Sequence, residues 1–389
     1  MPERSTNPTQ PRLIAVDMDG TLLGETGQVS PRNLAALLAA HAAGIEVVVA
    51  TGRRHAYAMR VLRPLDLPHA CALISSNGAV TRTLGAQSKP GAPPKLVLGG
   101  MDNPAGAPSV RAADGWGGTA RVPGAPSVPA LGGRVGETVP TELIARTHMS
   151  PETAVWLCAH LGDLRDALVL TFDTVGEDGE DTRGALVVEH LNTLHSSIAR
   201  WMEANEPYLL EITPIEQALH PTNGVAAGAP IQAMLCGTPE RMRAAEAHLL
   251  LDPRVVAVGH LSAMEAGAPH LASEMWDSNS RPILGLHRTE YPARDLSILD
   301  ILPAGCSKGA ALLSLAASRG IDASEILAIG DNWNDVSMLE VAGSAVLMDN
   351  APDDLKQLAR ERGWSIGASH RDDGVAIAIE SALEVSAPC

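Results

Sequence analysis

The stretch LIAVDMDGTL, residues 13–22, joins an apolar run to two aspartates that stand one residue apart. An uninterrupted apolar run is typical of a strand that is buried on both faces of a parallel sheet. Ligands of open α/β sheets bind at the carboxyl ends of such strands, so we expect Asp17 and Asp19 to lie at a site. In a regular strand their side chains would point the same way, whereas a turn at Met18, favoured by Gly20, would splay them around one small site.

The composition of the whole chain narrows the class of protein. Its 389 residues carry 45 acidic and 29 basic side chains, a net charge of -16, which argues against a nucleic-acid-binding surface. The five cysteines stand in no CxxC pair, which predicts reduced thiols. Residues 1–12 lack the apolar core of a signal peptide, and no apolar run is long enough to span a membrane. We therefore expect a soluble cytoplasmic protein, and the sequence carries no indication of an oligomeric state.

The N-terminal residues predict a βαβ unit followed by a third strand. The serine–proline pair at 30–31 is typical of a helix N-terminus. The β-branched run at 45–50 predicts a second buried strand, which ends at Thr51, and a third strand is expected at 71–74. Because the crossover makes the strands parallel, Thr51 should lie at the same sheet edge as Asp17.

A similar alternation of predicted helices and buried strands occurs near the C-terminus. Lys308 stands in the first turn of a predicted helix, and the apolar run at 326–329 leads into a loop with Asp331, Asn334 and Asp335. Because both terminal segments show the α/β pattern, we predict that they form one parallel sheet with helices on both faces. This would be a Rossmann-like core that is interrupted by an insertion.

The insertion differs in composition from the blocks on either side. We assign residues 1–82 and 303–389 to the core and residues 83–302 to a large α+β cap domain. Residues 85–137 are rich in Gly, Pro and Ala and are expected to form a mobile segment without chemistry. The remaining cap shows helical patterns at 151–161, 194–205 and 239–250, and strand-like runs at 167–172, 185–189, 231–235, 255–258 and 296–301.

Side chains of complementary chemistry follow the predicted strand ends. The set comprises four carboxylates, a hydroxyl and an ammonium group: Asp17, Asp19, Asp331, Asp335, Thr51 and Lys308. Carboxylates are the hard oxygen ligands that Mg²⁺ prefers, and the other two groups can donate to phosphate oxygens. In phosphoryl transfer, catalysis rests on positioning and charge neutralisation, and an aspartate can itself be the nucleophile. The set therefore indicates phosphoryl transfer.

Five segments carry these residues in a fixed order: DMDGTL at 17–22, TGR at 51–53, SSNGA at 75–79, SKG at 307–309 and GDNWND at 330–335. Together they resemble the motifs of the haloacid dehalogenase superfamily, and specifically its Cof-type hydrolases, whose large α+β cap the insertion fits by position. The residues around Gly343, 348–351 and 373–376 also fit that subgroup. Trp333 departs from the small or polar residue of the family's pattern, which bears on the substrate class rather than on the chemistry.

The resemblance implies a Mg²⁺-dependent phosphatase that hydrolyses a small phosphorylated metabolite, a sugar phosphate or a phosphorylated cofactor, through an aspartyl-phosphate. It implies that Asp17 attacks phosphorus and binds the metal. Asp19 would be the general acid and base, and its backbone carbonyl a metal ligand. The other residues it assigns are Thr51, Lys308 and Asn334 for phosphate oxygens, Asp331 for Mg²⁺, and Asp335 as a metal ligand or as the residue that orients one. Asn77 and Asn332 are interpreted as turn residues outside the catalytic set.

Other functions stay open at this point. A phosphomutase would pass the same aspartyl-phosphate to another hydroxyl group. A receiver-like signalling module also combines clustered aspartates with a threonine and a lysine, although Asp19 and the cap-sized insertion count against it. A metabolite-binding protein without turnover is the third alternative.

Overall fold

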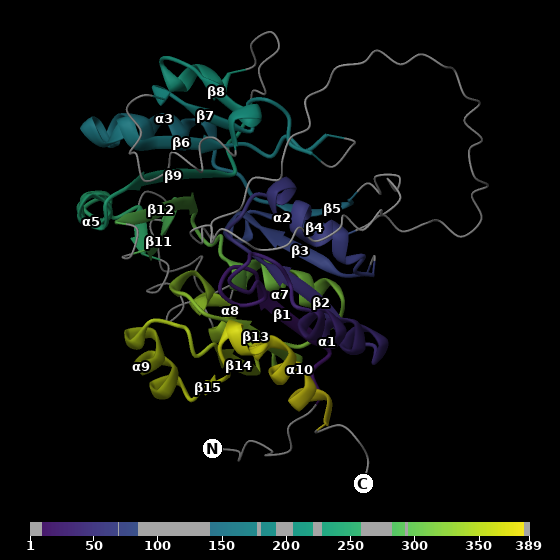
Figure 1. Ribbon diagram of the computed structural model, residues 1–389. Helices are drawn as coiled ribbons and strands as arrows, with labels where there is room; N and C mark the ends of the chain where they lie inside the picture. The colour runs from purple at the N-terminus through teal and green to yellow at the C-terminus, as the bar shows by residue number, and fades with distance from the viewer. Residues whose placement is uncertain are drawn as a thin grey trace, which may run out of the picture.

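The computed structural model describes residues 10–68, 70–84, 141–176, 180–191, 205–220, 228–257, 282–291 and 295–384. These residues form two sheets (Figure 1), the first built from both ends of the chain and the second from its middle. The Gly/Pro/Ala-rich segment expected at 85–137 and all but the last residue of the helix expected at 194–205 lie outside the described ranges. None of the described helices combines the length and the apolar character that crossing a membrane requires.

The first sheet has eight described strands in the order β15-β14-β13-β1-β2-β3-β4-β5. Its strands are β1 Leu13–Asp17, β2 Glu46–Ala50, β3 Ala72–Ser75, β4 Val80–Thr83, β5 Leu143–Arg146, β13 Ile326–Gly330, β14 Ser344–Leu347 and β15 Ser365–Ile366. All neighbours from β15 to β3 are parallel, and β1 lies between β2 and β13. The expected parallel core, interrupted in sequence but continuous in space, is confirmed.

Helices cover both faces of this sheet, as expected for a Rossmann-like core. Side chains alternate along a strand, so Ile14 and Val16 pack into one apolar cluster and Leu13 and Ala15 into the other. The first cluster is completed by α1 Pro31–Ala42, α2 His55–Leu62 and α10 Gly374–Glu384, and the second by α7 Lys308–Ser318, α8 Val336–Val341 and α9 Asp353–Arg362.

Two antiparallel strands at one edge of the first sheet were not expected. β3 ends in a tight turn, Ser76–Gly78, and a short turn of this kind can only return the chain antiparallel. β5 then pairs with β4, although residues 143–146 fall in the range assigned to the cap. The division of the chain at residues 83 and 302 stays a proposal.

The second sheet has seven described strands in the order β10-β11-β12-β9-β6-β7-β8. They are β6 Leu168–Thr171, β7 Leu186–Val188, β8 Leu209–Glu211, β9 Gln232–Gly237, β10 Val255–Ala257, β11 Leu284–Tyr291 and β12 Leu296–Pro303. Helices α3 Pro151–His160 and α5 Pro239–Leu249 pack on one face through a shared apolar cluster. The five expected strands are confirmed as β6, β7, β9, β10 and β12, whereas β8 and β11 are additional.

Ion pairs join the two sheets beside the first one's antiparallel edge. Arg82 on β4 donates two hydrogen bonds of 2.8 Å to Asp173, which follows β6, and Arg146 on β5 donates another of 3.2 Å. Arg54, just before α2, pairs with Asp181 of the second sheet's connections. The side chains of Arg82 and Asp173 are buried at this contact, so each charge is stabilised by the other instead of by water.

Replacing Asp173 by asparagine should destabilise the protein by about 3–5 kcal/mol, because Arg82 would keep a buried charge without its carboxylate. Urea unfolding followed by circular dichroism measures the change. Glu380→Gln is the matched control, since it breaks a pair with Arg32 that is largely open to solvent and should have little effect. Equal losses in the two variants would contradict the importance of the buried contact.

Candidate active site

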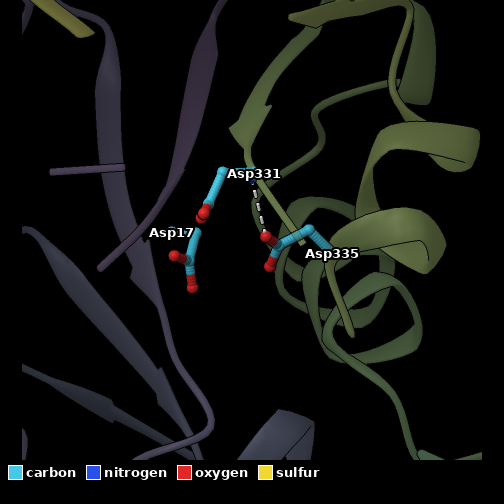
Figure 2. A group of neighbouring side chains, drawn as sticks. All are labelled: Asp17, Asp331 and Asp335. Carbon is cyan, nitrogen blue, oxygen red and sulfur yellow. Dashed lines mark hydrogen bonds between the residues drawn. The ribbon is translucent and has the colours of Figure 1, made fainter. Parts of the chain in front are cut away.

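Three aspartates meet at the carboxyl edge of the first sheet. Asp17 ends β1, Asp331 follows β13, and Asp335 lies one turn later in the short helix Trp333–Asp335. Because β1 and β13 are parallel neighbours, their carboxyl ends bring these side chains together. One carboxylate oxygen from each lies within 4.8 Å of the other two (Figure 2), and the residues are only 4%, 7% and 0% exposed.

Lys308 supplies the positive charge of this cluster. It is fully buried, and its Nζ lies 2.5 Å from Asp17 Oδ1 and 2.6 Å from Asp335 Oδ1. Burial works against its charge, but the two carboxylates together raise its pKa above the ordinary value. The unfavourable position of a cation in the first turn of α7 is thereby offset by two anions.

The carboxylates hold more negative charge than Lys308 neutralises. Burial, followed by repulsion from Asp335, raises the pKa of Asp17 to about 7, although Lys308 lowers it. Burial and the charge of Asp17 likewise raise the pKa of Asp331 well above its ordinary value. Three buried carboxylates with one ammonium group fit a divalent cation, which would remove this repulsion.

The three carboxylates are not equivalent. Both oxygens of Asp335 are occupied, because Oδ1 accepts from Lys308 and Oδ2 accepts from the backbone N–H groups of Asp331 and Asn332, at 3.0 Å each. Figure 2 shows one of these bonds, from the Asp331 backbone to the Asp335 side chain. Within the described part of the chain, Asp335 accepts three hydrogen bonds, whereas Asp331 accepts two and Asp17 accepts one. Asp335 therefore holds the loop and Lys308 in place, and Asp17 keeps the most acceptor capacity for a ligand.

Two further residues, neither of them a predicted site residue, hold Asp331 in place. Thr21 Oγ1 donates to its Oδ1 at 2.9 Å, and Asn350 Nδ2 donates to its Oδ2 at 3.2 Å. Gly20 has φ +81°, and a Cβ there would overlap the Asp331 carboxylate. The signal that could have found them is their place in motif segments, 17–22 and 348–351.

Asp19 lies apart from the cluster. The strand ends at Asp17 and Met18 is buried, so the chain turns and the two aspartates are splayed, the second of the two arrangements considered from the sequence. The Asp19 side chain is 43% exposed and pairs with Arg53, whose Nε donates to Asp19 Oδ2 at 2.7 Å. Arg53 in turn lies over the Tyr57 ring. Asp19 is thus held beside the site by an arginine rather than by a metal-binding neighbour.

The remaining predicted residues surround the cluster. Thr51 directly follows β2, is fully buried, and its Oγ1 accepts from the Arg53 backbone N–H at 3.1 Å. Asn334 Nδ2 donates to Asn77 Oδ1 at 3.2 Å. Asn77 is buried and donates to Asp300 of β12 at 2.8 Å, so it is more than a turn residue. No local pattern could have revealed that partner, which stands 223 residues away.

The family model of the haloacid dehalogenase-like hydrolases matches residues 14–89 and 287–379. These two parts carry all five motif segments and every predicted site residue. These two matched parts belong to the haloacid dehalogenase-like hydrolases. Strands β5 to β10 of the chain lie between the matched parts, so the match rests mainly on the first sheet and its helices.

Known proteins resemble this chain in part of the sequence and in the fold. It is 45% identical over 86 residues to the 5-amino-6-(5-phospho-D-ribitylamino)uracil phosphatase YwtE of Bacillus subtilis, which is 22% of this chain and 29% of that protein. The chain thus spans less than a third of that relative's length.

The fold of two solved structures matches this protein over nearly the whole chain. A haloacid dehalogenase-like hydrolase from Bacteroides thetaiotaomicron superposes with a TM-score of 0.57 at 20% identity, covering 95% of this chain and 99% of that one. A subclass IIB sugar phosphatase of the superfamily superposes with a TM-score of 0.56 at 16% identity, covering 96% and 99%. These likenesses confirm the expected fold, a Rossmann-like core with a large α+β insertion.

Proposed function

We propose that the chain is a Mg²⁺-dependent phosphatase that hydrolyses a small phosphorylated metabolite, such as a sugar phosphate or a phosphorylated cofactor. The observation that carries the proposal is the buried group of Asp17, Asp331, Asp335 and Lys308 at the carboxyl edge of the sheet. It offers a nucleophile, a cation and an anionic pocket at one point, which are the parts that phosphoryl transfer needs. The family membership and the partial match to a phosphatase support the same reading.

In the proposed reaction, a carboxylate oxygen of Asp17 bonds to phosphorus while the bond to the ester oxygen breaks. Asp19 gives its proton to the departing alcohol and then takes one from the water that cleaves the aspartyl-phosphate, so that phosphate leaves and both aspartates are restored. Asp19 has to turn from Arg53 toward Asp17 for this role. Thr51, Lys308 and Asn334 would hold the phosphate oxygens.

The proposed metal ligands are Asp17, Asp331 and the backbone carbonyl of Asp19. Asp335 would orient its neighbours, because it already accepts three hydrogen bonds, from Lys308 and from two backbone N–H groups. When bound there, Mg²⁺ would neutralise charge on the phosphoryl oxygens. The residues present fit such an ion, since Asp17 and Asp331 bring their negative charge into a buried space that one lysine serves.

Phosphate release from a panel of sugar phosphates, nucleotides, pyridoxal phosphate and a generic aryl phosphate, with Mg²⁺ or with EDTA, tests the proposal. We expect Mg²⁺-dependent release from at least one compound and none with EDTA. Release from no compound would overturn the phosphatase assignment. An isomerised sugar phosphate without free phosphate would instead identify a phosphomutase, and a stable phosphoprotein a signalling module.

The cellular location and the domain roles are also proposed. Four cysteines in the described part of the chain are free and buried, which supports a reducing, cytoplasmic environment. The second sheet is proposed to act as the cap that covers the substrate, with residues 143–146 serving the core sheet instead. The acidic net charge supports a small-molecule substrate rather than nucleic acid.

Adding Mg²⁺ should raise the melting temperature, and more so at pH 8 than at pH 5. The pKa of Asp17 is about 7 in the folded protein and 3.8 as an isolated group, so its contribution to stability is fully present below about pH 4 and is lost as the pH rises through 7. The ion would relieve the repulsion that then remains, whereas protons compete with it at low pH. Differential scanning fluorimetry at both pH values measures the gain.

The matched control is Asp331→Asn, which removes one proposed ligand and should abolish most of the Mg²⁺-dependent gain. A gain of the same size at both pH values, retained in this variant, would mean that the ion binds elsewhere.

A further inference from the structure

A buried chain of hydrogen bonds runs from the candidate site into the second sheet. Asn334 Nδ2 donates to Asn77 Oδ1 at 3.2 Å, and Asn77 Nδ2 donates to Asp300 Oδ2 at 2.8 Å. Gln232 of β9 donates to the other oxygen of Asp300. Asn77, Asp300 and Gln232 are all buried. These hydrogen bonds therefore link the loop that carries Asp335 to two neighbouring strands of the second sheet.

The Asp300 carboxylate decides which way each amide in this series of hydrogen bonds faces. An ionised Asp300 can only accept hydrogen bonds, so both amides must turn their NH₂ groups toward it. Asn77 then has only its carbonyl oxygen left for Asn334, whose NH₂ group must face that oxygen. The amide orientation of Asn334, at the edge of the site, is thus set by a charge on β12.

The turn that carries Asn77 also contacts the other proposed phosphate-binding segments. The Asn77 backbone N–H donates to Thr51 O at 3.1 Å, and a Cβ on Gly78 would overlap the carbonyl of Ser307, the residue before Lys308. Ser76 and Asn77 both have left-handed backbones, with φ 50° and 51°. Two non-glycine residues in a row hold this conformation only where surrounding contacts fix it, and the Asp300 bond is one of them.

We propose that Asp300 is a positioning residue of the site, which acts through Asn77 to orient Asn334. The orientation of the phosphate-binding groups then depends on how the second sheet packs against the first. This rests on the proposed function above. Among the described residues, the hydrogen-bond partners of the Asp300 side chain are Asn77 and Gln232, not Asp17, Asp331 or Lys308. β12 is well placed for the task, since it ends at Pro303 and the chain then enters α7 at Lys308.

The test is the variant Asp300→Asn, assayed for kcat, KM and inhibition by inorganic phosphate at pH 8.5. That pH lies above the pKa of Asp300, which burial raises to about 7. The asparagine carries one accepting and one donating group, so one of the two amides has to turn over or lose its hydrogen bond. We expect kcat/KM to fall about 10–100-fold, with a matching rise in the inhibition constant for phosphate.

Gln232→Met is the matched control. It removes the other donor to Asp300, is equally buried, and leaves the Asp300–Asn77–Asn334 connection in place. We expect a kinetic change of less than about threefold, although the melting temperature falls. A second test repeats Asp300→Asn in an Asn334→Ala background, where its effect on phosphate inhibition should disappear, because a residue that acts through Asn334 has nothing left to orient.

The outcomes separate the inference from the proposed function. A wild-type protein that releases no phosphate and binds none overturns both. With an active wild type, unchanged kinetics in Asp300→Asn, equal losses in Gln232→Met, or an undiminished effect in the Asn334→Ala background each overturn the positioning role. If Asp300→Asn does not fold, Asn77→Ala breaks the same connection from the core side and is judged by the same kinetic criteria.

Discussion

Replacing Asp17 by asparagine is expected to lower kcat by about three orders of magnitude or more, with the fold retained. The amide has nearly the shape of the carboxylate but lacks the charged oxygen that would bond to phosphorus. Folding should not suffer, because burial and repulsion already disfavour the ionised form of Asp17, as its pKa of about 7 indicates. Aryl phosphate hydrolysis at saturating Mg²⁺ measures the loss, and circular dichroism checks the fold.

Asp163→Asn serves as the matched control, since this aspartate is exposed in the second sheet's half of the molecule and should leave turnover unchanged. Turnover by Asp17→Asn equal to that of the wild type would rule out the nucleophile assignment. Residual activity with no trapped phosphoprotein would point instead to direct attack by water.

The variant Lys308→Met should lose both activity and stability. Methionine nearly preserves the volume, so the main change is the loss of the ammonium group that contacts Asp17 and Asp335. Leaving buried charges without their partner costs about 3–5 kcal/mol. Because protonation of the carboxylates relieves the cost, the loss of stability should be larger at pH 8 than at pH 5. Urea unfolding at the two pH values, without added metal, measures both effects.

Lys356→Met makes the same substitution at another lysine. Lys356 pairs with Asp349, whose side chain is 63% exposed, at 3.2 Å, so its loss should change stability little at either pH. Equal losses in the two lysine variants, or a Lys308→Met deficit that does not vary with pH, would show that Lys308 does not neutralise the carboxylate cluster.

Much of the site could be predicted because its residues follow buried strands directly. Apolar runs identify β1, β2 and β13, and a parallel sheet brings all of their carboxyl ends to one edge. Asp17, Thr51 and Asp331 therefore had to meet, whatever the intervening chain does. Fold and cluster both follow from local pattern combined with the handedness of the crossover.

Strand β11 shows why other features escaped prediction. Its sequence LGLHRTEY carries polar residues on both faces. Arg288 and Glu290 pair with Glu246 and Arg243 of α5, while His287 and Thr289 are buried on the opposite side. Neither face of β11 is apolar along its whole length, because its polar side chains are satisfied by partners in distant segments. An alternating sequence pattern identifies the buried face of a strand only where the buried side chains are apolar.

The sequence by itself determined the parallel core, the interruption by a second sheet, and the meeting of Asp17, Asp331 and Lys308, since strand ends and helix starts are encoded locally. Only the tertiary structure decided that Asp19 pairs with Arg53 and that Asn77 reaches Asp300. Those contacts depend on the angle of a turn and on how two sheets dock. Such geometry arises from packing between residues far apart in the chain, which no short pattern records.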